Sequence, residues 1–135
     1  WGALVAWAAV RGSIDWQTVI LYGAGIVWTL GYDTIYAHQD KLDDMLIGVK
    51  SSALRLGRHS RPAVCTFYFL TILGLTASAL LAELGWPAYA GLIIGGLQLA
   101  WQAKSVNFDD PDSCLTMFKS NHLFAAIIFS GFLIG

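Results

Sequence analysis

Five apolar runs separated by four polar connections make up this chain. A membrane-spanning helix needs about 20 mostly apolar residues, and the run from Ala63 to Ala82 provides them without a single charge. Because lipid offers the backbone no hydrogen-bond partner, such runs are predicted to be helices. The predicted helices are Trp1–Val10, Trp16–Gly31, Ala63–Ala82, Pro87–Ala103 and His122–Gly135. The first is expected to be the tail of a spanning helix in a longer protein.

This pattern predicts an all-α fold, a polytopic membrane bundle of about five transmembrane helices. Composition supports the prediction, because 13% of the residues are charged, against about 25% in soluble domains. No repeat or linker divides the chain, so residues 1–135 are predicted to form one transmembrane domain. A net charge of −1 gives no reason to expect a nucleic acid partner.

Positive charge is concentrated in two of the four connections. The connections 33–62 and 104–121 hold seven of the eight Lys and Arg residues, and Arg11 is the eighth. Connections rich in Lys and Arg stay on the cytoplasmic side of a membrane. The chain is therefore predicted to lie in a bacterial inner membrane, with both long connections facing the cytoplasm. In a eukaryote it would lie in the mitochondrial inner membrane, with both connections facing the matrix.

The first long connection carries a pattern of acids. If the helix continues past Asp33, then Asp40 and Asp44 follow it at steps of seven and four residues. At 100° per residue, the three carboxylates would lie within roughly 40° of one another on one helix face. Mg²⁺ takes one or two carboxylates together with waters and phosphate oxygens. Asp40 and Asp44 are thus candidate metal ligands, and a hydrated polar helix end is the competing interpretation.

Three nearby residues are candidates for contact with substrate or with the membrane interface. Lys50 is the basic residue we expect to contact phosphate, whereas Arg58 and Arg61 fit membrane topology and anionic headgroups. Tyr36 is a candidate for contact with phosphate or an aromatic ring, or an interface anchor. His38 is expected to be an interfacial polar residue on another face of the helix.

Two further patterns concern helix ends and helix packing. Asp110 followed by Pro111 is typical of an N-cap and first helical residue. Gly91 and Gly95 form a GxxxG pattern, which indicates either a close helix contact or only the frequency of glycine in membrane helices.

The stretch "YDTIYAHQDKLDDMLIGVKSSALRLG" resembles the second aspartate-rich motif of the UbiA-type intramembrane prenyltransferases, and "FDDPDSCLTMFKSN" resembles their last cytoplasmic connection. Within the family, the likeness is strongest to the members that prenylate 4-hydroxybenzoate for ubiquinone biosynthesis. The resemblance covers essentially the whole chain and implies the C-terminal portion of a nine-helix membrane fold.

The resemblance implies a Mg²⁺-dependent transferase that moves a polyprenyl group from polyprenyl diphosphate to 4-hydroxybenzoate. By that likeness Asp40 and Asp44 would hold the metal and diphosphate, and Asp33 would support them in catalysis and substrate binding. Lys50 and Tyr36 would be substrate contacts. The family's first aspartate-rich motif is not found in this chain, which has no acid before Asp15. The segment is therefore expected to be inactive by itself.

Other functions remain open at this point. A UbiA-type enzyme could use another aromatic acceptor, such as a naphthoate, homogentisate or haem precursor. A cation transporter would place its acids near the middle of the bilayer. A structural membrane subunit would tolerate loss of Asp40 and Asp44.

Overall fold

The computed structural model describes residues 2–48 and 50–135, with side chains at all of these positions except 42 and 43. The described residues are helical, with turns between the helices and without strands. The elements are α1 (Gly2–Arg11), α2 (Trp16–Tyr36), α3 (Lys41–Ile47), α4 (Ser52–Leu56), the short 3-10 helix η1 (Gly57–His59), α5 (Ser60–Leu81), α6 (Trp86–Ser105), α7 (Pro111–Lys119) and α8 (Asn121–Ile134).

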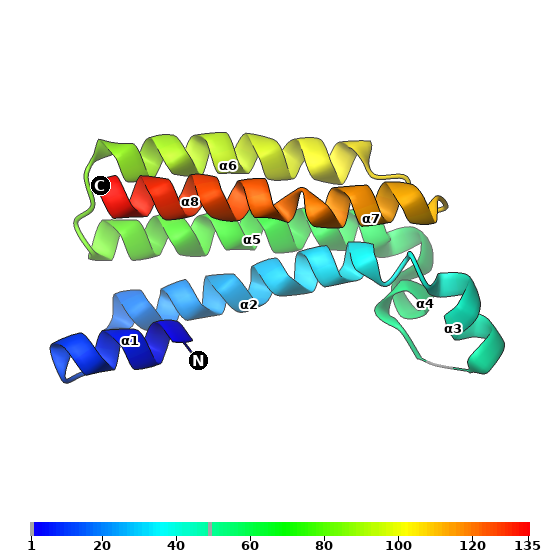
Figure 1. The fold of residues 1–135 in the computed structure, drawn as a ribbon, viewed down its shortest axis with the longest axis horizontal. Coiled ribbons are helices and arrows are strands. Elements are labelled where there is room, and N and C mark those ends of the chain that lie inside the picture. Colours follow the sequence, from blue (N-terminus) through cyan, green and yellow to red (C-terminus); the bar gives the residue numbers. More distant parts are fainter. Residues whose placement is uncertain (1, 49) are drawn as a thin grey trace.

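The predicted apolar runs all correspond to helices, so the all-α prediction is confirmed. In Figure 1, α2, α5, α6 and the pair α7–α8 lie side by side as long rods. By length and composition, the stretches Ser52–Leu81 and Pro111–Ile134 are apolar enough to cross a membrane. Trp1, the first residue of the first predicted helix, lies outside the described residues.

The core is a set of apolar side chains between the rods. Ile35 from α2, Val64 from α5, Leu99 from α6 and Phe124 from α8 are each 2% exposed or less. Other large apolar side chains face outward, among them Phe69 and Ile93, which are 68% and 66% exposed. Apolar residues both inside and outside are expected of a helix bundle whose surroundings are lipid.

The two charged connections lie at the same end of the bundle, as the charge pattern predicted. The segment with α3 and α4 and the start of α7 occupy one end, while the α5–α6 turn and the C-terminus occupy the other (Figure 1). At the far end, the Gly85 amide donates a hydrogen bond to the Gly135 carbonyl at 3.0 Å.

Helix ends follow local chemistry. The Asp110 carboxylate accepts a hydrogen bond from the Asp112 amide at 3.1 Å, and Pro111 opens α7, which confirms the predicted cap. Helix α3 ends at Gly48, whose φ of 75° is a left-handed conformation that side chains rarely adopt.

Candidate functional site

The helix does not continue from Asp33 to Asp44, and this part of the prediction is wrong. Helix α2 ends at Tyr36, and α3 begins only at Lys41. The amides of His38 and Gln39 bond to the carbonyls three residues earlier, Ile35 and Tyr36, at 3.1 and 2.8 Å. Such bonds tighten the last turn and end an α-helix. Asp33 therefore belongs to α2, Asp40 precedes α3, and Asp44 lies within α3.

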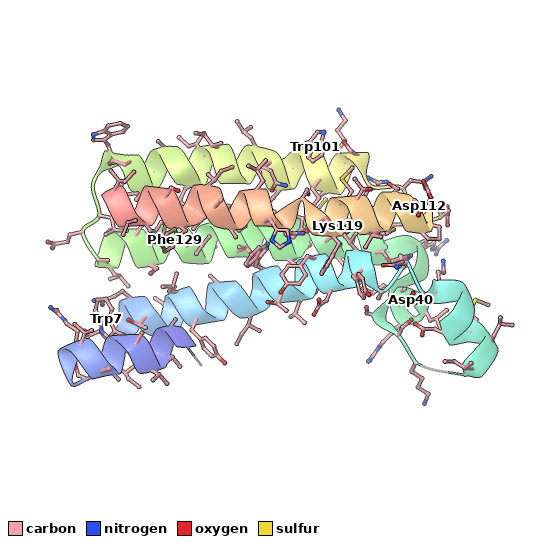
Figure 2. All side chains as sticks on the ribbon, in the orientation of Figure 1. Trp7, Asp40, Trp101, Asp112, Lys119 and Phe129 are labelled. Carbon is pink, nitrogen blue, oxygen red and sulfur yellow. The ribbon has the colours of Figure 1, made fainter. Side chains whose placement is uncertain are left out.

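The three acids Asp33, Asp40 and Asp44 lie at the charged end of the bundle. Figure 2 places Asp40 at the start of α3, next to the end of α2. In the described part of the chain, the one ion pair joins Arg11 to Asp15, far from these acids. Among the described residues, no side-chain hydrogen bond or ion pair reaches the carboxylates of Asp33, Asp40 or Asp44, whose backbone carbonyls accept only helix and turn bonds. Their negative charge is thus not neutralised by a neighbouring Lys or Arg.

Carboxylates without an ion-pair partner are suitable ligands for a Mg²⁺ ion that is also bound by a phosphate group. Mg²⁺ prefers oxygen ligands, and it is commonly held by one or two carboxylates, several waters and substrate phosphates. Within the described residues, no three Asp, Glu, His or Cys side chains converge into a closed metal cage. The donor chemistry therefore suits an open site that a diphosphate would complete.

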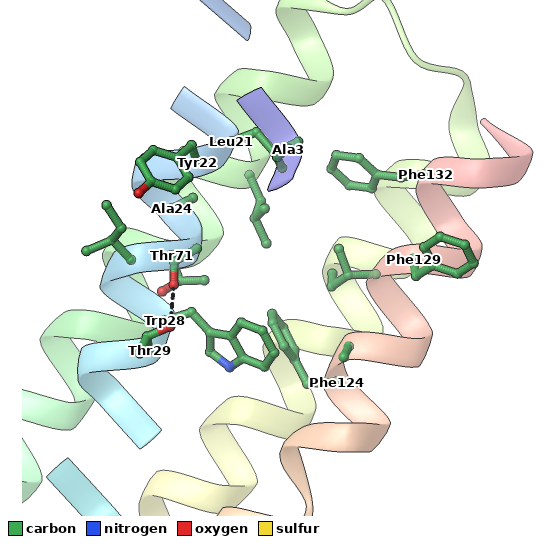
Figure 3. A pocket seen from close by; sticks show the side chains of 15 residues that line it. Ala3, Leu21, Tyr22, Ala24, Trp28, Thr29, Thr71, Phe124, Phe129 and Phe132 are labelled. Carbon is green, nitrogen blue, oxygen red and sulfur yellow. Dashed lines mark hydrogen bonds between the residues drawn. The ribbon is translucent and has the colours of Figure 1, made fainter. Parts of the chain in front are cut away.

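An apolar cavity of about 540 Å³ lies between α2, α5 and α8. Figure 3 shows Phe132 and Phe124 of α8 facing Leu21 and Ala24 of α2 across it, and Phe129 also lines it. The polar groups on its wall are few, and the Thr29 hydroxyl is occupied by a hydrogen bond to the Gly25 carbonyl at 3.0 Å. Such a space suits a hydrocarbon chain.

A smaller pocket of about 180 Å³ adjoins this cavity. Its walls include the aromatic rings of Trp28, Tyr32 and Phe118, together with Asn121 and His122. Trp28 lines both spaces. A cavity of roughly 150 Å³ holds benzene, so the pocket has the size of a single aromatic ring. Along α2 the order is therefore apolar cavity, ring-sized pocket, and then Asp33.

The two predicted substrate contacts, Tyr36 and Lys50, differ in their surroundings: Tyr36 packs on another ring, and Lys50 is exposed. Tyr36 packs on Phe118 of α7, with ring centroids 4.7 Å apart, so it contacts the wall of the ring-sized pocket. Phe118 also contacts Tyr32 at 5.6 Å. Lys50 is exposed between α3 and α4 and has no ion pair within the described part of the chain.

His38 is the residue whose position the sequence misjudged. It is 3% exposed, and its Nε2 lies 2.7 Å from the Ser60 hydroxyl. Burial lowers the pKa of His38, and the charge of Lys41 lowers it further, against opposing contributions from the Phe108 backbone and Asp109. Burial of the ring thus favours its neutral form. The sequence contained no signal for this buried contact, because Ser60 lies 22 positions away and His38 is surrounded in sequence by acids.

A buried polar network, which sequence reasoning also missed, holds the junction of α7 and α8. Gln102 is fully buried, accepts a hydrogen bond from the Tyr68 hydroxyl, and donates to the Met117 carbonyl and the Ser120 hydroxyl, both at 2.7 Å. The Trp28 indole donates to Asn121 at 3.0 Å. Buried polar groups need such partners, particularly in lipid. The one sequence signal was the pair of glutamines at 98 and 102 in an apolar run.

Comparison with known proteins identifies the family. Residues 1–128 match the model of the UbiA prenyltransferase family. The chain belongs to the UbiA prenyltransferase family. It is therefore part of a membrane protein, in agreement with the many large apolar side chains exposed on its surface. No solved structure matches the chain significantly.

The relatives carry consistent names. The chain is 45% identical to the mitochondrial 4-hydroxybenzoate polyprenyltransferase of Aedes aegypti, over 100% of this chain and 31% of the relative. It is 47% identical to the Arabidopsis thaliana protein of the same name, over 100% and 33%. It is 42% identical to 4-hydroxybenzoate geranyltransferase 2 of Lithospermum erythrorhizon, over 100% and 44%. The chain thus spans less than half the length of each of these relatives.

Proposed function

We propose that the protein containing this chain transfers a polyprenyl group from a polyprenyl diphosphate to 4-hydroxybenzoate, with Mg²⁺. The observation that carries the proposal is an order along α2. An apolar cavity, a ring-sized aromatic pocket and unpaired carboxylates follow one another toward the charged end of the bundle. These are the three environments that a hydrocarbon tail, an aromatic ring and a metal-bound diphosphate require.

Asp40 and Asp44 are proposed to hold Mg²⁺ and, through it, the diphosphate, with Asp33 supporting from the end of α2. When bound, the metal would stabilise the negative charge that develops on the departing diphosphate. Lys50 would add a cation that contacts the phosphate oxygens. Both the metal role and the residue assignments are proposals that rest on the unpaired state of the carboxylates.

The remaining residues would orient the organic partners. The bond between the allylic carbon and the diphosphate oxygen breaks, a carbon–carbon bond forms ortho to the hydroxyl of the ring, and the ring loses one proton. The rings of Trp28, Tyr32 and Phe118 would hold the acceptor beside the reacting carbon. The apolar walls of α2, α5 and α8 would hold the tail and keep water away from positive charge on the allylic carbon.

The names of the relatives favour the same acceptor. The polyprenyl and the geranyl enzymes differ in the donor named, while each name specifies 4-hydroxybenzoate. The word mitochondrial in several of these names favours a mitochondrial membrane, with the acid-rich connection facing the matrix. A transporter is disfavoured, because its acids would be expected near the bilayer middle and these lie at a helix end.

The test is a transfer assay on the full-length protein in liposomes, with polyprenyl diphosphate, 4-hydroxybenzoate and Mg²⁺. Asp40→Asn and Asp44→Asn should each lower turnover by roughly 100-fold or more, because transition-state charge loses its stabilisation. Asp112→Asn is the matched control, since Asp112 is an exposed acid in the first turn of α7.

Turnover that requires Mg²⁺ and is lost in both Asn variants but not in the control would support the proposal. Unchanged turnover in both variants with normal membrane insertion would contradict it. Prenylation of a different aromatic acid in place of 4-hydroxybenzoate would keep the reaction class and reject the acceptor.

A further inference from the structure

The acid-bearing segment projects from the bundle as an arm, defined here as residues 37–48 and 50–59. It leaves at the end of α2 and returns at the start of α5, and Figure 1 shows α3 extending beyond the ends of the long rods. Asp40, Asp44 and Lys50 all lie on this arm. Asp33 lies outside it, on α2.

The two ends of the arm are joined by a buried contact. His38 follows α2, Ser60 begins α5, and the Ser60 hydroxyl lies 2.7 Å from the His38 Nε2. Ser60 donates its single hydroxyl proton to the Gly57 carbonyl at 2.8 Å, so the His38 Nε2 is the donor to Ser60. Both residues are buried, at 3% and 1% exposed. A hydrogen bond shielded from water in this way is costly to break.

The base of the arm is also fixed to the other charged connection. The His38 ring packs against Phe108, with centroids 4.7 Å apart. The guanidinium of Arg61, the next residue after Ser60, lies 5.4 Å from the centre of the same Phe108 ring. The contacts of His38 therefore join the end of α2, the start of α5 and the segment before α7 at one point.

Beyond this base, the described apolar residues at the end of α3 are exposed, and α3 is held through its packing on α4. Met45, Leu46 and Ile47 of α3 are 60%, 84% and 73% exposed. Helix α3 packs on α4, and α4 anchors through Ala53, which is fully buried. Asp44 on α3 is therefore held through the base of the arm and through the packing of α4 against α2 and α5.

We infer that the His38–Ser60 hydrogen bond is a clamp that positions Asp40 and Asp44 relative to Asp33. This inference rests on the proposed function, because it assigns the metal to those carboxylates. His38 is a positioning residue and does not itself contact substrate. A shift of the arm would separate the carboxylate on α2 from those on the arm and weaken the binding of a divalent ion.

Four variants of the full-length protein separate the hydrogen bond from the bulk of the ring. Ser60→Ala removes the acceptor, and His38→Asn removes a donor at the Nε2 position. His38→Gln places an amide nitrogen where Nε2 lies and should restore the contact. His59→Gln is the control, because His59 is the exposed histidine beside Ser60.

Two readouts apply. The first is the Mg²⁺ concentration that gives half-maximal turnover, together with kcat at saturating Mg²⁺. Loss of a residue that orients metal ligands typically lowers metal affinity by about 10-fold or more. We expect His38→Asn and Ser60→Ala to raise the half-saturating concentration about 10-fold while kcat changes less than about 2-fold. His38→Gln and His59→Gln should stay near the wild type.

The second readout is independent of catalysis. Binding of Mn²⁺ alone, measured by the electron paramagnetic resonance of the free ion, should weaken in the same two variants. Trypsin should also cut the arm faster at Lys50 and Arg55, which are exposed. The double variant His38→Asn/Ser60→Ala should be no worse than either single one, because both remove the same contact.

Unchanged Mn²⁺ affinity and cleavage in His38→Asn and Ser60→Ala would overturn the clamp. The clamp would also be overturned if His38→Gln bound Mn²⁺ as weakly as His38→Asn. The loss would then come from the packing of the His38 ring and not from its hydrogen bond. If His38→Asn fails to insert, Ser60→Ala carries the test. The proposed function and the clamp can also fail separately. If the wild type binds Mn²⁺ more tightly than the two clamp variants but transfers no prenyl group, the proposed function is rejected and the clamp is not.

Discussion

At the scale of single residues, Arg61 has a role different from the one its charge suggested. The sequence favoured topology and lipid headgroups. In the structure its guanidinium donates hydrogen bonds to the carbonyls of Ala103, Lys104 and Val106, at 2.5, 2.8 and 2.7 Å. These carbonyls lie at the end of α6, where the helix leaves them without partners. Arg61 thus caps the end of a helix whose last carbonyls lie 42 to 45 positions further along the chain.

Replacement of Arg61 should therefore destabilise the protein. Arg61→Ala removes three hydrogen bonds from a charged donor, and we expect the free energy of unfolding to fall by about 1–3 kcal/mol. Arg61→Lys should recover only part of the loss, because an ammonium group cannot reproduce the planar fork. Thermal unfolding in detergent measures this. Arg58→Ala is the control. An equal loss of stability in Arg58→Ala would show that the effect of Arg61→Ala comes from the lost charge and not from the helix cap.

At the scale of elements, α6 and α8 approach closely through glycine. A Cβ added at Gly91 would lie 3.2 Å from the Ile127 carbonyl oxygen and 3.3 Å from the Gly131 Cα. At Gly95 it would meet Phe124 at 3.0 Å. Of the two interpretations of the GxxxG pattern, close helix contact is therefore the one that the structure supports. Small residues at such contacts let membrane helices pack tightly.

Gly91→Ala should separate α6 from α8, because backbone atoms that face the new methyl group cannot move aside easily. We expect a loss of about 1–3 kcal/mol in stability, the range for overpacking. Gly96→Ala is the matched control on the same helix, since its Cβ would meet Ile72 at an ordinary 3.8 Å and a better helix former is introduced. Thermal unfolding of both variants in detergent checks this, and equal stability of the two would contradict it.

At the scale of the whole molecule, the ring-sized pocket exists only because α2 meets the α7–α8 junction. The Gln102 network fixes that junction, and Phe118 from α7 contacts Tyr32 from α2. No single element contains the pocket, so its shape depends on the packing of α2 against the α7–α8 rod and on the break at Ser120 between α7 and α8.

Phe118→Ala in the full-length protein should impair the aromatic acceptor selectively. Loss of one ring from the pocket wall should raise the KM for 4-hydroxybenzoate about 10-fold, in line with roughly 1.5 kcal/mol for an aromatic contact. The KM for polyprenyl diphosphate should change little. Steady-state kinetics with each substrate varied in turn measures this. Phe69→Ala, on an exposed face of α5, is the control. A larger effect on the diphosphate KM would place the acceptor elsewhere.

The sequence by itself determined the long apolar helices, their order and the end of the bundle that carries charge. These properties depend on local hydrophobicity, on caps such as Asp110–Pro111, and on the sum of charges in each connection. It also pointed to Asp33, Asp40 and Asp44, because a run of acids beside a spanning helix is unusual whatever the packing.

Only the tertiary structure decided how those acids are presented. The break after Tyr36 coincides with the contact of His38 with Ser60 and Phe108, which are 22 and 70 positions further along the chain. Periodicity within one helix carries no information about partners so distant in sequence. The ring-sized pocket and the cap supplied by Arg61 have the same origin, since each joins elements that meet only when the helices pack.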